Sequence, residues 1–255
     1  MGKKILIAGY GQTVIYTELQ GPIQSSFSRD MMAAGHVVSI LRDHGCVVTY
    51  MPANVAANEF PDSIASLSTY DALLLGDISA DTLLLKPDAV FASTAGANRL
   101  NLIREFVSSG RGFMMAGGWF SFQGISGKGR YHETPVEEIL PVVIRPYDDR
   151  VETPEGAAPL VRLPEHPILK DLPLEWPHFL GYNRLTVKGS GETVMTLRDD
   201  PFLVTGTYGR GRAAAFASSL APHWGGLKEC IEWEGYARFW CNVIDWLTSA
   251  DEQNI

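Results

Sequence analysis

The chain of 255 residues has few cysteines, no cluster of basic residues and no long apolar run. Its three cysteines, Cys46, Cys230 and Cys241, are odd in number, and their spacing matches neither a disulfide framework nor a metal-binding knuckle. The net charge of −8, without a patch rich in Lys and Arg, excludes the footprint of a nucleic-acid-binding protein. No stretch approaches the roughly 18 apolar residues needed to cross a bilayer. We therefore expect a cytoplasmic protein that binds neither nucleic acid nor membrane.

Sequence motifs for metals and common cofactors are absent as well. None of the six histidines forms an H-x-x-x-H pair. The segment "GYGQTV" (9–14) has Val14 where a dinucleotide-binding turn has its third glycine, and "GKGRYHETP" (127–135) lacks the pattern of a phosphate-binding loop. We expect no metal and no cofactor.

The first 117 residues alternate between predicted strands and predicted helices. The strands are short continuous apolar runs, and the helices carry apolar residues at helical spacing with a glycine after the last turn. The strands are expected at 3–9, 46–52, 70–77 and 111–117, and the helices at 25–45 and 97–110. Continuous apolar strands indicate a sheet buried on both faces. The fold class is therefore α/β, with a flavodoxin-like, doubly wound, mostly parallel sheet flanked by helices.

The remaining chain is expected to extend the same domain. Residues 124–200 are rich in Pro and Gly, contain short extended pieces at 158–163 and 192–197, and predict a loop-rich insertion with an antiparallel β extension. A hairpin is predicted over 202–218 and a final helix over 234–249. No linker composition marks a boundary, so we expect one domain over 1–255. Exposed aromatic residues in the middle region favour a homo-oligomer.

The turn at 117–124, "GGWFSFQG", follows a predicted buried strand. Ligands of such sheets bind beyond the carboxyl ends of the strands, where a strained glycine-rich turn can present a nucleophile. Small residues two positions before and after Trp119, Gly117 and Ser121, fit that pattern, but an indole has no nucleophilic atom. Trp119 is therefore either a core aromatic or a platform in a pocket. Ser121 has bulky flanks and is a poor nucleophile, and Gly118 is expected to allow close approach of the backbone.

Two residues near this turn could carry acid–base chemistry. His223, in "APHWGG", follows a strand that is expected to end at the same edge, and a neutral imidazole can exchange protons near pH 7. Asp77 ends the strand "YDALLLGD" and could bind a substrate hydroxyl or cap the next helix. We take His223 and Asp77 as candidate catalytic residues.

The order of these elements resembles the class I glutamine amidotransferase-like superfamily. More closely, the chain is similar to the bacterial group of glutamine amidotransferase-like proteins, and the resemblance covers nearly the whole chain. It is carried by "GGWFSFQGISGKGRYHETPVEEILPV", "DDRVETPEG", "LGYNRL" and "APHWG". In active amidotransferases the turn carries Cys, and a later His–Pro–Glu supplies the base and its orienting acid. Here Trp119 occupies the Cys position, and His223 is followed by Trp224 and Gly225.

The resemblance implies that the chain keeps the ligand cleft of the superfamily but lacks the nucleophilic Cys. We predict that the chain does not hydrolyse glutamine, because losing a nucleophile costs several orders of magnitude in rate. Members of the trehalose-utilisation type also lack the Cys, which suggests a carbohydrate-related small-molecule ligand. The expected binding residues combine aromatic faces with polar groups: Gly118, Trp119, Phe120, Ser121, Asn183 and Trp224. Two alternatives stay open: an amidohydrolase that uses Cys230 or Ser121, and a non-catalytic interaction protein.

Overall fold

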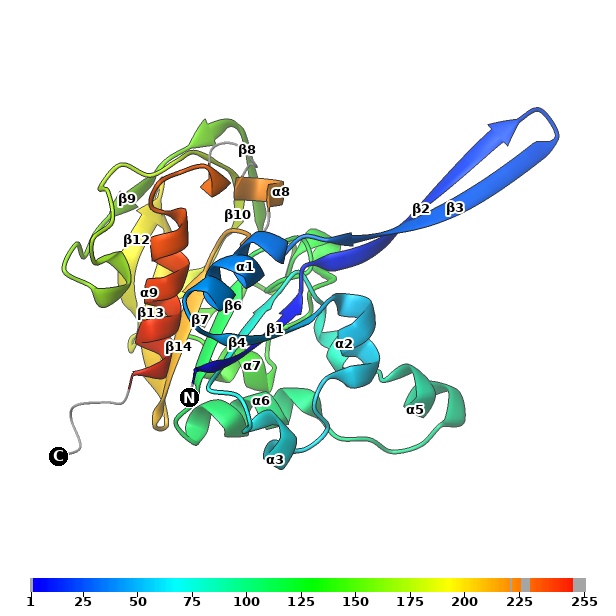
Figure 1. Ribbon diagram of the computed structural model, residues 1–255, viewed down its shortest axis with the longest axis horizontal. Helices are drawn as coiled ribbons and strands as arrows, with labels where there is room; N and C mark the ends of the chain where they lie inside the picture. The colour runs from blue at the N-terminus through cyan, green and yellow to red at the C-terminus, as the bar shows by residue number, and fades with distance from the viewer. Residues whose placement is uncertain (1, 221, 226–229, 250–255) are drawn as a thin grey trace.

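An eight-stranded sheet forms the centre of the molecule (Figure 1). The computed structural model describes residues 2–220, 222–225 and 230–249. The strands lie in the order β4 (Val47–Met51), β1 (Lys4–Gly9), β5 (Ala72–Gly76), β6 (Gly112–Ala116), β14 (Gly211–Phe216), β13 (Asp200–Tyr208), β12 (Glu192–Leu197) and β9 (Pro159–Val161). The first five strands pair with one another in parallel. The pairs β14–β13, β13–β12 and β12–β9 are antiparallel. In chain order the parallel strands read 2-1-3-4-5, the flavodoxin-like order, so the predicted fold class is confirmed.

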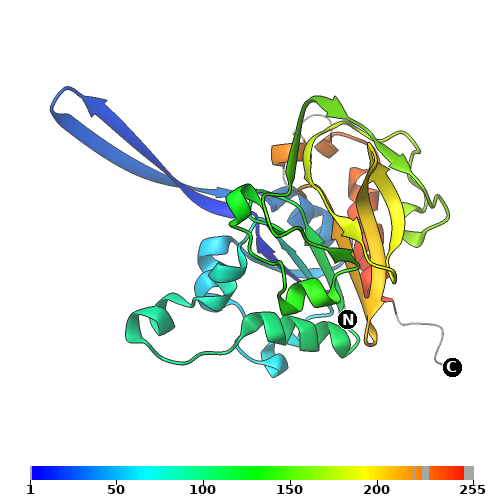
Figure 2. The same ribbon diagram turned by 180° about the vertical axis from the view of Figure 1, so that it is seen from behind.

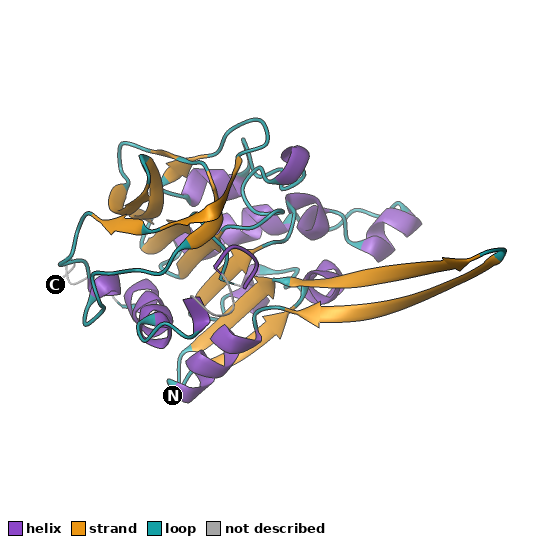
Figure 3. Cartoon of the chain, turned by 90° about the horizontal axis from the view of Figure 1, so that it is seen from above, coloured by secondary structure: helices purple, strands orange, loops and turns teal. Residues whose placement is uncertain are grey.

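Helices cover both faces of the sheet, as Figure 3 shows from above. One layer contains α1 and α9, which pack together, and the other contains α6 with α3, α4 and α7. Every residue of β5 and β6 is buried, as expected for strands covered on both sides. The helices span α1 (Gly35–Asp43), α2 (Ala53–Glu59), α3 (Ile64–Leu67), α4 (Ala80–Leu84), α5 (Pro87–Ala92), α6 (Arg99–Ser108), α7 (Pro135–Ile139), α8 (Pro222–Gly225) and α9 (Tyr236–Thr248). In the described part of the chain, no helix is long and apolar enough to cross a membrane.

The predicted helix over 25–45 is wrong in its first part. Residues 11–20 and 23–32 form a two-stranded antiparallel hairpin, β2 (Gly11–Gln20) and β3 (Ile23–Met32), and only α1 is helical. Gly21, with φ of 59°, and Pro22 make the two-residue turn. A glycine at the first turn position is typical of a tight hairpin. The hairpin projects from the body of the molecule (Figure 1).

The middle region builds the predicted antiparallel extension. It supplies β9 and β12 to the central sheet, and two small sheets pair β8 (Arg150–Ala157) with β10 (Phe179–Asn183) and β7 (Val142–Val143) with β11 (Thr186–Val187). Two 3-10 turns, η1 (Ile125–Gly127) and η2 (Pro167–Leu169), complete the region. Figure 2 shows β9 and β12 on the side of the molecule opposite the β2–β3 hairpin. The predicted hairpin over 202–218 is confirmed as β13 and β14.

Candidate functional site

Three neighbouring parallel strands bring their carboxyl ends to one edge of the sheet. β1 leads into Tyr10, β5 leads into Asp77, and β6 leads into the turn at 117–124. The strand order reverses between β1 and β5, and such a switch point is where doubly wound sheets bind ligands. The edge predicted from the sequence is therefore the edge that the structure forms.

Asp77 holds the turn after β6 from the side of β5. Its Oδ1 accepts a hydrogen bond of 3.0 Å from the backbone N–H of Phe120, and its own N–H donates to Oγ of Ser121 at 2.7 Å. The approach requires glycine at 118, because a side-chain carbon there would lie 2.8 Å from Oδ1 of Asp77. Asp77 is half-buried and has a φ of 47°, a left-handed conformation that is uncommon outside glycine.

Asn183 and Asp149 hold the same turn from the middle region. Asn183 accepts from the N–H of Gly118 at 3.0 Å, and its Nδ2 donates to Oδ1 of Asp149 at 2.8 Å. Asp149 also accepts from the backbone N–H groups of Gln123 and Gly124, both at 2.9 Å. Asn183 and Asp149 are buried, and burial raises the pKa of Asp149 despite these donors. Both side chains therefore form hydrogen bonds with the backbone of the turn and with each other instead of with solvent.

Tyr10 closes the turn from the side of β1. Its hydroxyl donates to the carbonyl of Gly117 at 2.9 Å, and its side chain is almost completely buried. Burial first, and the nearby charge of Asp77 second, raise the pKa of Tyr10 well above its usual value. The phenol therefore stays protonated and acts as a fixed donor. The sequence analysis did not identify Tyr10 as a site residue.

Trp119 gives the turn an aromatic surface with charged neighbours. Its side chain is 38% exposed, and the guanidinium of Arg150 lies 5.7 Å from the ring centroid. Arg150 forms ion pairs with Asp148 at 2.9 Å and with Glu152 at 3.6 Å. Glu152 in turn accepts a hydrogen bond of 3.0 Å from Nε1 of Trp224. A continuous set of aromatic and charged side chains thus runs from β6 through β8 to α8.

The strained conformation of a nucleophile turn is not at Trp119. Among the non-glycine residues of the turn, the positive φ lies at Phe122, at 49°, rather than at Trp119. The next helical segments along the described chain are η1 and α7, so no helix follows the turn directly. The expectation that Trp119 stands at the centre of a strained turn is therefore wrong. Hydrogen bonds to Asp77, Asn183 and Asp149, rather than a strand-to-helix elbow, define this backbone.

The predicted binding residues divide into exposed and buried groups. Trp119 is exposed and Phe120 half-buried. Gly118, Ser121, Asn183 and Trp224 are buried. Ser121 is completely buried, donates to the carbonyl of Ala116 at 2.6 Å and accepts from Asp77, so it connects two strand ends. A nucleophilic role for Ser121 would require breaking both bonds.

The candidates that follow β14 are only partly described. His223 lies in α8, and its side chain is outside the described part of the structure. α8 packs on β10, where a side-chain carbon at Gly181 would lie 2.2 Å from Nε1 of Trp224. Glycine at 181 therefore lets the Trp224 ring reach Glu152. The structure thus brings α8 toward the Trp119 surface through one hydrogen-bonded pair.

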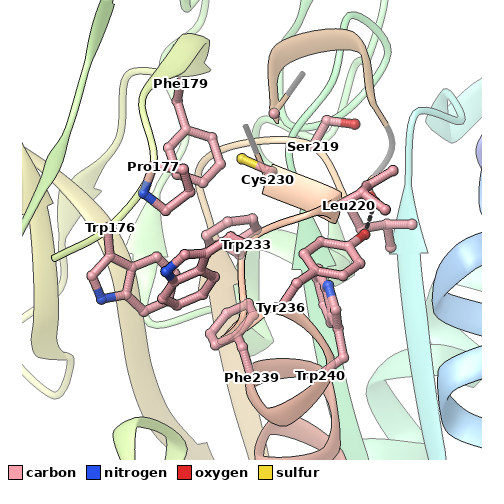
Figure 4. A pocket seen from close by; sticks show the side chains of 13 residues that line it. Trp176, Pro177, Phe179, Ser219, Leu220, Cys230, Trp233, Tyr236, Phe239 and Trp240 are labelled. Atoms are coloured by element: carbon pink, nitrogen blue, oxygen red, sulfur yellow. Dashed lines mark hydrogen bonds between the residues drawn. The ribbon is translucent and has the colours of Figure 1, made fainter. Parts of the chain in front are cut away.

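Cys230 does not lie on the surface around Trp119. Its side chain is buried and lines an apolar cavity of about 20 Å³, which has room for about one water molecule (Figure 4). The other lining residues are mostly aromatic, among them Trp176, Phe179, Tyr236 and Trp240. A pocket for a small organic ligand usually has several hundred Å³. Glutamine would not fit this cavity as it stands.

Sequence patterns provide only weak signals for the polar residues that organise the site. Asp149, Arg150 and Glu152 all lie in "DDRVETPEG", which the sequence analysis used only for the family resemblance. Their roles depend on contacts with residues more than twenty positions away, such as the Asp149–Gln123 and Glu152–Trp224 pairs. No local pattern reveals such contacts. Among the residues that the structure describes, no group of His, Cys, Asp and Glu could hold a metal.

Comparison with known proteins identifies the family. A family model described as "putative glutamine amidotransferase" matches residues 4–249, and the chain belongs to this family. The resemblance predicted from the sequence is therefore confirmed. The comparison with curated proteins found no match.

Two solved structures are similar over nearly their full length. Cytoplasmic protein STM3548 from Salmonella typhimurium is 34% identical, with a TM-score of 0.91, over 95% of this chain and 98% of that one. Cytoplasmic protein STM1381 from Salmonella typhimurium LT2 is 36% identical, with a TM-score of 0.90, over 96% and 100%. Both are described as cytoplasmic, which agrees with the predicted location. A Thua-like protein from Parabacteroides merdae shares the fold, at 14% identity, a TM-score of 0.56 and coverage of 97% and 90%.

Proposed function

We propose that this protein does not hydrolyse glutamine and instead binds a small polyhydroxylated molecule, such as a sugar or sugar acid, on the surface around Trp119. The observation that carries the proposal is the partly exposed Trp119 ring at the carboxyl end of β6, with Arg150 against it. In this proposal a ligand surface takes the place that the nucleophile has in active amidotransferases.

The chemistry of the residues supports the first part of the proposal. The Trp119 indole cannot form a thioester, and its backbone lacks the strain of a nucleophile turn. Ser121 is buried and hydrogen-bonded on both sides, and Cys230 faces a cavity of about 20 Å³. Among the residues that the structure describes, no observation favours the amidohydrolase alternative.

The arrangement of polar groups supports the second part. An indole offers a broad apolar face on which the C–H side of a sugar ring can pack. The Arg150 guanidinium provides several donors, and the carboxylates of Asp148 and Glu152 accept hydrogen bonds from hydroxyl groups. A few convergent polar groups beside an aromatic surface are typical of small-molecule sites. If the bound molecule is also transformed, His223 and Asp77 are the candidates for proton transfer.

A ligand screen tests the binding proposal. Neutral sugars and sugar acids are added to the wild type and to Trp119→Ala, and the melting temperature and titration calorimetry are recorded. We expect a ligand that stabilises the wild type and binds Trp119→Ala at least about tenfold more weakly, since lost stacking and area cost about 1.4 kcal/mol or more. Leu160→Ala, which changes an exposed apolar side chain on the edge strand β9, is the control. A screen without any stabilising compound would argue for the interaction-protein alternative.

An ammonia assay tests the catalytic part. Wild type and Trp119→Cys are incubated with glutamine, and ammonia release is expected from neither, because a thiol at 119 would sit on an unstrained backbone. Release from the wild type that disappears in Cys230→Ala would overturn the proposal. So would a covalent adduct with a glutamine-mimicking electrophile.

A further inference from the structure

The β2–β3 hairpin carries a large part of the exposed apolar surface of the molecule. It is a ribbon of ten residue pairs, and β2 contacts the body at α2. Its exposed apolar side chains are Ile15, Tyr16, Leu19, Ile23, Phe27, Met31 and Met32. A lone two-stranded ribbon is marginally stable in water, so a ribbon of this length needs a covering surface. The sequence analysis placed the exposed aromatics in the middle region, but the hairpin contains the stacked pair Tyr16 and Phe27, at 5.0 Å.

One face of the ribbon has a self-complementary order. Directly paired residues of an antiparallel ribbon share a face, so this face can be read from the register. From the base to the tip its rows are Met31, then Val14 with Arg29, then Tyr16 with Phe27, then Glu18 with Ser25, then Gln20 with Ile23. The aromatic row is central, a charge of opposite sign lies on either side of it, and an apolar residue ends each side. Read from the tip to the base, the rows give nearly the same pattern, except that Glu18 and Arg29 exchange places.

We propose that this face packs on the same face of a second copy of the chain, with the two ribbons running in opposite directions. In that arrangement Tyr16 and Phe27 meet their own copies, Met31 meets Ile23, and Arg29 lies beside Glu18 of the second copy. Arg29 and Glu18 are two rows apart in one ribbon, roughly 14 Å at about 3.4 Å per residue, so they cannot pair within a chain. Ribbons that ran in the same direction would bring Arg29 against Arg29. The charges therefore select the opposed arrangement.

The rest of the molecule offers additional surface at the same end. The hairpin and α5 both project toward this end in Figures 1 and 2. Val90 and Phe91 of α5 are exposed, Phe91 by 89%, and so are Leu84 and Leu85 just before it. In the opposed arrangement the ribbon of each copy extends toward the body of the other copy at this end. A second copy can therefore cover both projections, whereas a short peptide on the ribbon would leave α5 bare. The tip of each ribbon would also reach the base of its partner, which continues into Tyr10 of the candidate site.

Sedimentation and light scattering of the full chain over a wide range of concentration test the proposal. We expect a dimer, weakened at least about tenfold in Arg29→Glu and in Glu18→Arg, and restored in the double variant that exchanges both charges. Ser28→Glu, on the opposite face of the same strand, is the matched control and should dimerise like the wild type. Circular dichroism confirms that each variant is folded. A thiol cross-linker should join Phe27→Cys into dimers but not Ser28→Cys.

A monomeric wild type at all concentrations would overturn the proposal and assign the ribbon to a different partner. Dimers that tolerate Arg29→Glu as well as Ser28→Glu would also overturn it. So would single variants that each weaken the dimer without recovery in the double variant, because recovery is the signature of the opposed arrangement. The ammonia and ligand assays at the Trp119 surface are independent of all these outcomes.

Discussion

Replacing Asp149 with alanine should lower the free energy of unfolding by about 3–6 kcal/mol. The carboxylate accepts from two backbone N–H groups, those of Gln123 and Gly124, and from Nδ2 of Asn183. Each buried donor left without its acceptor costs about 1–3 kcal/mol. Gln123 is half-buried and can recruit water, so the expected sum falls below the upper bound of three full penalties.

A graded series separates this cause from general damage to the loop. Asp149→Asn keeps an oxygen for Gly124 and Asn183 but turns an amide N–H₂ toward Gln123, so about 1–3 kcal/mol should be lost. Asp148→Ala, at the neighbouring and more exposed carboxylate, should cost about 1 kcal/mol or less. Urea unfolding followed by circular dichroism gives all three values. Equal losses for Asp148→Ala and Asp149→Ala would refute the assignment of Asp149 as the acceptor that holds the turn.

Two further predictions concern the packing around the site. Burial and the charge of Arg212 lower the pKa of His166 to about 4, and its Nδ1 accepts from the N–H of Ile168, which a protonated ring cannot do. Because the pKa is lower in the folded state, this stabilisation is present above pH ~6.5 and is lost as the pH falls toward 4. It amounts to about 3 kcal/mol, and unfolding curves at several pH values should show a smaller loss of stability between pH ~6.5 and 4 in His166→Asn than in the wild type. Gly181→Ala should displace the Trp224 ring and lower the melting temperature by several degrees, about 2–4 °C per kcal/mol, while Gly189→Ala, with nothing within 4 Å, should not. Equal melting temperatures for these two variants would contradict the close approach.

The fold could be predicted from the sequence where the pattern had one interpretation. The apolar runs at 70–77 and 111–117 are too short for helices, and both are buried strands. Phe27 and Met31 are four positions apart, which places them on one side of a helix but equally on one side of a strand. The spacing alone could not decide between the two. The deciding feature was non-local: residues 11–20 pair with 23–32 across the turn at Gly21.

The site was predictable to the extent that position in a parallel sheet defines it. Asp77 and Trp119 follow strands β5 and β6, and their common edge follows from the fold class. What each polar side chain does there was not predictable. Ser121 and Asn183 have the chemistry of ligand-binding residues, but both are buried and their hydrogen bonds go to the protein. Whether a polar group faces a ligand or a backbone depends on the elements that cover it, and β8 and β10 come from the region with the weakest pattern.

The way the turn is held bears directly on what this member of the family can do. An active amidotransferase needs a turn that projects one reactive atom from a strained backbone. Here Asp77, Asn183 and Asp149 each accept hydrogen bonds from N–H groups of the turn, and the strain falls on Phe122. Backbone donors that are paired within the protein are not available to stabilise an oxyanion. The same bonds hold the backbone on both sides of Trp119, and a held backbone suits binding because less conformational freedom is lost when a ligand arrives. The stabilisation of the turn therefore supports the function proposed above, recognition of a small molecule by a rigid surface at Trp119.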